Sequence, residues 1–163
     1  MEKYKRDRKS LYLLFVDFRQ AFDRVWHAGL LYKLAKAGVS NRFYAVIKNM
    51  YSKIEVAVQR DEVMSPYFHS KVGVRQGDNL SPTLFNVFSN DIPMLFGPEC
   101  CPANFGDLPI SCLMYADDLV VLSESTNGLQ RATDKLSRWC KTWALEIKIS
   151  KPKLCSPHPH LKI

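Results

Sequence analysis

Runs of apolar residues divide the chain into short strands, some of which end in acidic residues. Leu11 to Val16 is a continuous apolar run that ends in Asp17, which is typical of a buried strand that presents a carboxylate at its end. Ile110 to Tyr115 and Leu119 to Leu122 flank Ala116-Asp117-Asp118, and this arrangement predicts a hairpin. The pattern therefore places acidic residues at two strand ends.

Apolar residues at helical spacing follow the first strand. Asp23 is expected to cap a helix that stops at Gly38. A second helix is expected from Ser40 or Asn41 to about Tyr51, with one apolar face made of Phe43, Val46, Ile47 and Met50. Two strands, Ile54 to Gln59 and Tyr67 to Val74, are expected around the turn-rich stretch Arg60–Pro66.

The second half of the chain predicts two more helices. Ser81-Pro82 is a helix start, because a capping residue precedes a proline, and the helix is expected to continue to Pro93. Gly97 to Pro109 is expected to be a loop. The last helix buries a face made of Leu129, Ala132, Leu136, Trp139, Cys140 and Trp143. Leu145 to Ile149 is the closing strand.

The order of these elements predicts an α+β fold. Apart from the middle strand pair it is β-α-β-β-α-β, a layout in which helices cover one face of an antiparallel sheet. The first strand then lies beside the hairpin, and Asp17 and Asp117 become neighbours at one edge of the sheet. We expect one domain over residues 11–154, between a basic segment at 1–10 and an irregular tail at 155–163.

Composition narrows the choice of partner and compartment. The net charge of +7 and pI near 9.2 favour a polyanionic partner, although a basic soluble domain of another kind fits equally well. The five cysteines have no CxxC spacing, which predicts free thiols and an intracellular protein, nuclear or cytoplasmic. No apolar run is long enough to cross a bilayer, so no membrane association is expected. The oligomeric state is not determined by these features.

Carboxylates that converge at a sheet edge repel one another unless cations neutralise them. Mg²⁺ suits such a site, because it binds one or two carboxylates together with water and substrate phosphates. A pair of ions at such a site supports nucleotide polymerisation, with Mn²⁺ as a substitute. Adjacent aspartates at a turn also have a purely structural explanation, since Asp tolerates turn conformations.

Four ordered segments resemble the motifs of reverse transcriptases in the form found in non-LTR retrotransposons. Phe15-Val-Asp17-Phe-Arg-Gln-Ala-Phe22-Asp23-Arg-Val-Trp26-His27 resembles the first aspartate motif, and Tyr115-Ala-Asp117-Asp118 the catalytic hairpin. The segment from Gly73 to Phe85 is similar to the nucleotide-and-template motif. Trp143 to Lys153 is a weaker match to the lysine-bearing segment, because Pro152 stands where the family has threonine.

The resemblance implies a polymerase palm with part of the fingers, and roles for individual residues. Asp17, Asp117 and Asp118 would bind two Mg²⁺ ions, with Asp118 contributing least directly, helped by the backbone carbonyl of Phe18. Phe22 would disfavour ribonucleotides. Residues that would contact the nucleotide or the template are Arg75, Gln76, Gly77 and Tyr115, with Lys151 or Lys153 protonating the pyrophosphate. For Arg75, a surface salt bridge is the competing explanation.

The implied partners are an RNA template, a DNA primer and deoxynucleoside triphosphates. We expect the chain to be truncated, without most of the fingers and the thumb, and to have little polymerase activity by itself. Two alternatives stay open at this point. One is a group II intron maturase-type reverse transcriptase, although Ala21 to His27 favours the non-LTR branch. The other is an inactive or domesticated remnant that binds nucleic acid.

Overall fold

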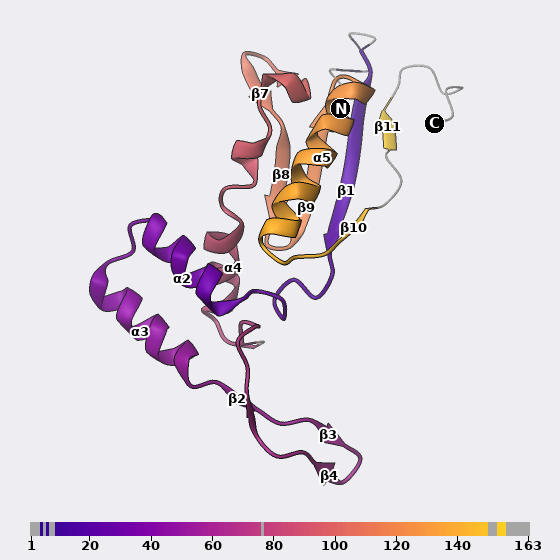
Figure 1. Cartoon of the computed structure of the whole chain (residues 1–163). Helices are drawn as coiled ribbons and strands as arrows, with labels where there is room; N and C mark the ends of the chain where they lie inside the picture. The colour runs from indigo at the N-terminus through magenta and orange to yellow at the C-terminus, as the bar shows by residue number, and fades with distance from the viewer. Residues whose placement is uncertain (1–3, 5, 7–8, 76, 150–152, 156–163) are drawn as a thin grey trace. The chain divides into compact units, whose positions relative to one another are not determined.

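The computed structural model describes residues 4, 6, 9–75, 77–149 and 153–155 (Figure 1). The chain divides into two compact units. The first consists of Met1–Ala21 and Asn90–Ile163 and carries the main sheet, and the second consists of Phe22–Ser89. The domain boundaries expected at residues 10 and 154 stay a prediction.

The first unit is built on an antiparallel sheet in the order β10-β1-β9-β8. These strands are β1 (Leu11–Phe18), β8 (Cys112–Tyr115), β9 (Asp118–Ser123) and β10 (Ile147–Ile149). A further strand, β11 (Lys153–Cys155), pairs with the first half of β1, on residues 11–13. The first strand thus lies between the hairpin and the closing strand, as the β-α-β-β-α-β pattern requires. The predicted α+β fold is confirmed.

Helix α5 (Thr126–Thr142) covers one face of this sheet (Figure 1). That face carries Leu14 and Val16 of β1 with Leu119 and Val121 of β9, all buried. Burying a side chain of this size stabilises the fold by roughly 1.5–3 kcal/mol. The helix begins after Ser125, whose hydroxyl oxygen accepts a hydrogen bond from the Gly128 amide at 3.0 Å. Its buried residues are Gly128, Leu129, Ala132, Leu136, Trp139 and Cys140, so the predicted face is confirmed, with Trp143 just beyond the helix and half-buried.

A second hairpin closes part of the other face of the sheet. It consists of β6 (Ala103–Phe105) and β7 (Leu108–Ile110), preceded by 3₁₀ turns η1 (Pro93–Leu95) and η2 (Pro98–Cys100). Tyr4, Leu11, Leu13, Ala103 and Leu122 form a buried cluster there. The prediction of a loop from Gly97 to Pro109 was therefore wrong. The segment is rich in turn-forming residues, but it contains two three-residue strands, which packing against Tyr4 stabilises.

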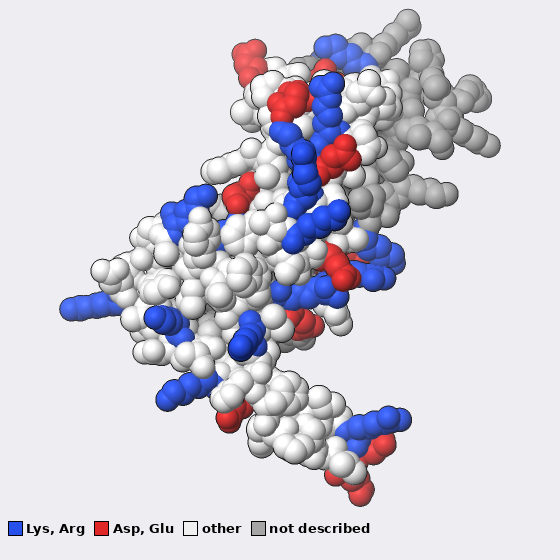
Figure 2. Space-filling view, viewed as in Figure 1, with Lys and Arg blue, Asp and Glu red and all other residues white. Residues whose placement is uncertain are grey.

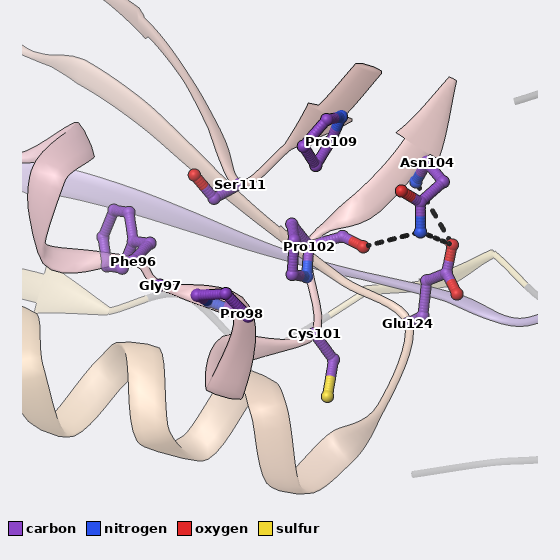
Figure 3. A pocket seen from close by; sticks show the side chains of 9 residues that line it. All are labelled: Phe96, Gly97, Pro98, Cys101, Pro102, Asn104, Pro109, Ser111 and Glu124. Atoms are coloured by element: carbon purple, nitrogen blue, oxygen red, sulfur yellow. Dashed lines mark hydrogen bonds between the residues drawn. The ribbon is translucent and has the colours of Figure 1, made fainter. Parts of the chain in front are cut away.

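Hydrogen bonds fasten this hairpin to the N-terminal segment and to the end of β9. The Tyr4 hydroxyl donates to Glu124 Oε1 at 2.7 Å and accepts from the Asn104 amide at 2.5 Å. The Asn104 side chain also donates to Glu124 Oε1, at 3.2 Å (Figure 3). Beside these residues lies a hollow of about 450 Å³, lined among others by Phe96, Pro98 and Cys101. The carboxylate of Glu124 is thus a structural acceptor in this corner of the unit.

Within its described residues, the second unit contains helices and a narrow β-ribbon (Figure 1). Its helices are α2 (His27–Lys36), α3 (Asn41–Ser52) and α4 (Ser81–Ser89). The ribbon pairs β2 (Glu55–Val56) with β5 (Phe68–His69), and β3 (Gln59–Arg60) with β4 (Val63–Met64). The predicted strand pair is present but shorter than expected. His69 Nε2 lies 3.7 Å from the Glu55 carboxylate.

Two expected helix caps are absent. Asp23 does not cap α2, which begins after Trp26. Residues 19–24 form turns, and the carbonyls of Val25 and Phe22 accept hydrogen bonds from the Gly73 and Val74 amides, both at 2.8 Å. These bonds compete with a helical turn.

Ser81 is also not a cap by its side chain, because its hydroxyl donates to the Arg75 carbonyl. Asp78 Oδ1 instead accepts from the Leu80 amide at the start of α4. By contrast, Gly38 follows the last turn of α2 with a φ of 76°, which confirms the predicted stop.

The expected apolar face of α3 is only partly buried. Ile47 and Tyr51 are its buried residues, whereas Phe43 and Val46 are about half exposed. An i, i+4 pair makes one narrow stripe along a helix. Helical spacing identified the helix correctly but overestimated the width of the face that packs.

Candidate catalytic site

Four side chains lie in one row across the end of the main sheet. The register pairs Lys148 of β10 with Asp17 of β1, Asp17 with Asp118 of β9, and Asp118 with Tyr115 of β8. Directly opposed residues project to the same face, with Cβ atoms about 5 Å apart. All four are exposed, and they lie on the face opposite to the one that α5 covers. The fold therefore brings the first aspartate motif beside the catalytic hairpin.

Asp117 lies in the turn that joins β8 to β9. Because Tyr115 and Asp118 are paired, this turn contains only Ala116 and Asp117. Ala116 has a φ of 52°, a left-handed conformation that costs an L-residue about 1–2 kcal/mol. The residue paired with Asp17 is thus Asp118, whereas Asp117 lies in the turn and not in a strand. Shared metal binding by Asp17 and Asp117 stays a prediction.

The carboxylates form an open set of oxygen ligands. Among the residues that the structure describes, no three His, Cys, Asp or Glu side chains form a group that could hold a metal ion. Mg²⁺ does not need such a cage, since it takes one or two carboxylates and completes its shell with water and phosphate oxygens. The opposed pair Asp17 and Asp118 fits that requirement. A cation between them also offsets the cost of opposing like charges.

Lys148 is a residue that reasoning from motifs missed. It faces Asp17 across β10 and β1, on the same exposed face. Opposite charges at directly paired positions contribute roughly 0.2–1 kcal/mol. The alternation of apolar and basic residues along Ile147-Lys148-Ile149 was the sequence signal that could have identified Lys148 as outward-facing.

The two lysines that were expected near the pyrophosphate are not placed there by the structure. Lys151 lies outside the described residues. The backbone of Lys153 pairs with Leu13, four positions before Asp17 along β1, a separation of roughly 13 Å at about 3.3 Å per residue. Its proposed role in protonation stays a prediction.

Phe18 closes β1 directly after Asp17. Its side chain is buried, and its backbone pairs with Ile147 of β10. The ring therefore belongs to the core, and only its backbone is available for the metal-binding role that the resemblance implies. Ligation by its carbonyl oxygen stays a prediction.

In the second unit, Phe22 and Gly77 line one hollow of about 570 Å³. The other residues around it are Asp78, Asn79, Ser81 and Pro82. The Phe22 ring is half-buried and packs on Phe85, with ring centroids 5.2 Å apart. Gly77 has a φ of 82°, which favours glycine, and a Cβ there would meet no atom within 4 Å. Two of the expected nucleotide-binding residues thus share a cavity.

The loop that begins at Gly73 and leads to this hollow is held in place by His27 and Tyr51. His27 Nε2 donates to the Gly73 carbonyl at 2.9 Å, and its ring packs edge-on against Tyr51. Burial raises the pKa of Tyr51, whose hydroxyl lies beside Ser81 and the Arg75 backbone. His27 and Tyr51 are therefore supporting residues. The Arg75 side chain is exposed, and Gln76 lies outside the described residues.

Comparison with known protein families agrees with this geometry. The family described as "Reverse transcriptase (RNA-dependent DNA polymerase)" matches residues 1–162. The chain belongs to the reverse transcriptase family. Enzymes of this family generally use divalent metal ions, and this agrees with the expectation that the cofactor is a divalent cation.

The similar curated proteins are polymerases of mobile elements. The RNA-directed DNA polymerase from mobile element jockey of Drosophila melanogaster is 36% identical over 143 residues, and that of Drosophila funebris is 34% identical. Each match covers 84% of this chain and 15% of the relative. A probable polymerase from transposon BS of Drosophila melanogaster is 33% identical and covers 89% of this chain. The predicted non-LTR branch of this reverse transcriptase family is thus confirmed, while the chain spans about 15% of these relatives' length.

A solved structure shows the same fold at low sequence identity. Apo telomerase from Candida tropicalis, truncated from its C-terminal domain, superposes with a TM-score of 0.59 and 17% identity. The match covers 91% of this chain and 32% of the telomerase chain. Within the described part of the chain, no helix combines the length and apolar character needed to cross a membrane.

Proposed function

We propose that this chain supplies the catalytic carboxylates of an RNA-directed DNA polymerase that copies the RNA of a non-LTR retrotransposon. The observation that carries the proposal is the register of β1 and β9, which opposes Asp17 to Asp118 in a chain of the reverse transcriptase family. The partners are an RNA template, a DNA primer and deoxynucleoside triphosphates. The similarity to polymerases of jockey and transposon BS supports this choice.

The aspartates at the sheet end hold the metal ions in this proposal. Asp17, Asp117 and Asp118 provide the carboxylates, and the Phe18 carbonyl provides one more oxygen. Divalent ions supply the charge that activates a 3′-hydroxyl for attack on the α-phosphorus and stabilises the departing pyrophosphate. The exposed row leaves space for water and phosphate ligands, which Mg²⁺ requires and Mn²⁺ also accepts.

The hollow of the second unit holds the nucleotide in this proposal. Phe22 lies under the sugar, and Gly77 allows the backbone to approach the nucleotide. Arg75, Gln76 and Tyr115 contact the nucleotide or the template, and Lys151 or Lys153 donates the proton to pyrophosphate. The shared cavity of Phe22 and Gly77 supports the first of these assignments.

The test is primer extension on an RNA template with Mg²⁺. Because the chain spans about 15% of its relatives, a jockey polymerase fragment that lacks the matching segment is supplied in trans. We expect extension when both pieces are present and essentially none with the 163-residue chain by itself. Asp17→Asn is expected to lower the rate by on the order of 10³-fold, since the metal-bound charge contributes several kcal/mol.

The control for that assay is Asp134→Asn, which removes the same charge from the exposed side of α5. Its rate is expected to stay within about twofold of the wild type. Extension that persists unchanged in Asp17→Asn contradicts the proposal.

Sugar selection provides a second test in the same assay. Phe22→Ala removes the ring beside Gly77, so ribonucleotides are expected to enter more readily, by on the order of 10-fold in the ratio of ribo- to deoxynucleotide incorporation. Phe43→Ala, an exposed ring on α3, is the matched control. An unchanged ratio in Phe22→Ala refutes the gate.

A further inference from the structure

The exposed side of α5 carries a line of positive charge. The helix contains four basic residues, Arg131, Lys135, Arg138 and Lys141, and one acidic residue, Asp134, so its side chains carry a net charge of +3. The first three follow one another at spacings of four and three, which places them on one stripe. Figure 2 shows blue side chains gathered along this helix. We name the four basic residues the α5 stripe.

The acidic neighbours of the stripe are already engaged. Glu99 forms an ion pair with Lys135, and this contact lowers the pKa of Glu99. The Asp134 carboxylate accepts a hydrogen bond from Gln130 at 2.9 Å. Arg138 and Lys141 are exposed, and neither makes an ion pair with any residue in the described part of the chain. The C-terminal half of the stripe therefore has cationic groups available for an external anion.

A hollow with a mixed lining of apolar, aromatic and basic residues lies directly beside these groups. It has a volume of about 470 Å³ and is lined by Met94 and Leu95 of η1 and by Arg138, Trp139 and Trp143 at the end of α5. The Met94 side chain is 81% exposed and Trp143 is half-buried, whereas the ring of Trp139 is buried and packs against Trp143 at a centroid distance of 6.3 Å. Aromatic and apolar surface next to basic residues is the combination that holds single-stranded nucleic acid, through base stacking and phosphate contacts.

This surface is separate from the catalytic row. Helix α5 covers the face of Leu14 and Val16, whereas Asp17 and Asp118 project from the opposite face of the same sheet. A primer end at the aspartates does not occupy the α5 stripe. The stripe therefore is not explained by the polymerisation site.

We infer that the α5 stripe and the Met94–Trp143 hollow bind single-stranded RNA on the back of the catalytic sheet. RNA as the partner class rests on the proposed function. Phosphates contact Arg138 and Lys141, and an unstacked base enters the hollow. Duplex RNA keeps its bases stacked and binds less tightly, because the hollow then gains no base.

The experiment measures fluorescence anisotropy of a labelled oligo(U) RNA of about 12 nucleotides with the full 163-residue chain at about 50 mM salt. The double variant Arg138→Ala/Lys141→Ala is expected to weaken binding by on the order of 10-fold. Its salt slope is expected to fall by about 1.4, because each lost phosphate contact contributes about 0.7 on single strands. Arg42→Ala/Lys48→Ala removes the same charge from exposed positions of α3 and is expected to bind within about twofold of the wild type.

Equal losses in both double variants, no loss in the stripe variant, or tighter binding of an RNA duplex of the same length would overturn the inference. A readout on the unaltered chain guards against misfolded variants: ultraviolet cross-links to oligo(U) are expected in the peptides of η1 and the end of α5. Cross-links confined to other peptides overturn it as well. The anisotropy measurement contains no divalent ion and no primer, so failure of the metal site and failure of the α5 stripe give different results.

Discussion

The first unit contains two hairpins whose two-residue turns are similar in composition but differ in their surroundings. The β6–β7 turn consists of Gly106 and Asp107, and the β8–β9 turn of Ala116 and Asp117. In both, the first residue has a positive φ, 70° for Gly106 and 52° for Ala116. Hairpin turns with this conformation at their first central position favour glycine there. The β6–β7 turn follows that rule, and the β8–β9 turn does not.

The side chains that surround the two hairpins also differ. The β6–β7 hairpin is held by Tyr4, Glu124 and Asn104, so its strands are fastened by side chains outside the hairpin. The β8–β9 hairpin instead presents Asp117 and Asp118 beside Asp17. Strained backbone with clustered like charges is unfavourable for stability and is a frequent property of functional sites. The two hairpins thus differ in their neighbours: the proposed role of Asp117 depends on Asp17 of the adjacent strand β1.

The largest expected difference between the turns is catalytic. In primer extension with the jockey fragment in trans, Asp117→Asn is expected to lower the rate by on the order of 10³-fold, since a metal-bound carboxylate is lost. Asp107→Asn makes the same change in the same kind of turn and is expected to stay within about twofold. Similar rates for the two variants would show that the turns do not differ in function.

The next effect concerns the fastening of the β6–β7 hairpin. Burial, and then the hydrogen bond to Glu124, raises the pKa of Tyr4 to about 12. The folded state thus favours the neutral phenol, and the stability it contributes is present below pH 10 and is lost as the pH rises toward 12. Tyr4→Phe is expected to lower the free energy of unfolding by about 2 kcal/mol near neutral pH, since Glu124 and the Asn104 amide lose a partner.

Urea unfolding at several pH values measures this contribution. Between pH 10 and 12 the wild type is expected to lose more stability than Tyr4→Phe. Tyr67→Phe, at an exposed position of the ribbon, is the control and is expected to behave as the wild type. A Tyr4→Phe curve parallel to that of the wild type would show that the hydroxyl does not fasten the hairpin.

The smallest expected effect comes from exchanging the first residues of the two turns. Gly106→Ala places a Cβ at a φ of 70° and is expected to destabilise the fold by about 1 kcal/mol. Ala116→Gly removes the strain of the positive φ at this position. It is expected to stabilise the fold by roughly 0.5 kcal/mol, because the entropy that glycine adds to the unfolded chain offsets part of the gain. Thermal unfolding measures both, and changes of the same sign would contradict the strain assigned to Ala116.

The parts of the fold that depend on local pattern were predictable from the sequence. The apolar run before Asp17 gave the strand and its terminal carboxylate, and the segments around Ala116-Asp117-Asp118 gave the hairpin. Buried positions of α5 repeat at helical spacing, so its core face was correct from Leu129 to Cys140. In these segments the local sequence and the tertiary packing favour the same structure.

Features that depend on long-range pairing were not predictable from pattern. Lys148 faces Asp17 only because β10 pairs with β1 in one particular register. Asp23 has the residue type of a helix cap, but the backbone at 73–74 donates hydrogen bonds to the carbonyls of Phe22 and Val25 on either side of it. The short strands β6 and β7 depend on Tyr4, which lies about a hundred positions earlier in the chain. Each of these outcomes is decided by a partner distant in the sequence.

Metal binding by the chain tests the central claim most directly, because it needs neither primer nor template. Titration with Mn²⁺, followed by the electron paramagnetic resonance signal of the free ion, compares the wild type with Asp17→Asn, Asp117→Asn and Asp107→Asn. The account predicts that the first two variants bind Mn²⁺ at least about tenfold more weakly, while Asp107→Asn binds as the wild type does. Unchanged affinity in Asp17→Asn, or an equal loss in Asp107→Asn, would contradict a metal site at the end of β1.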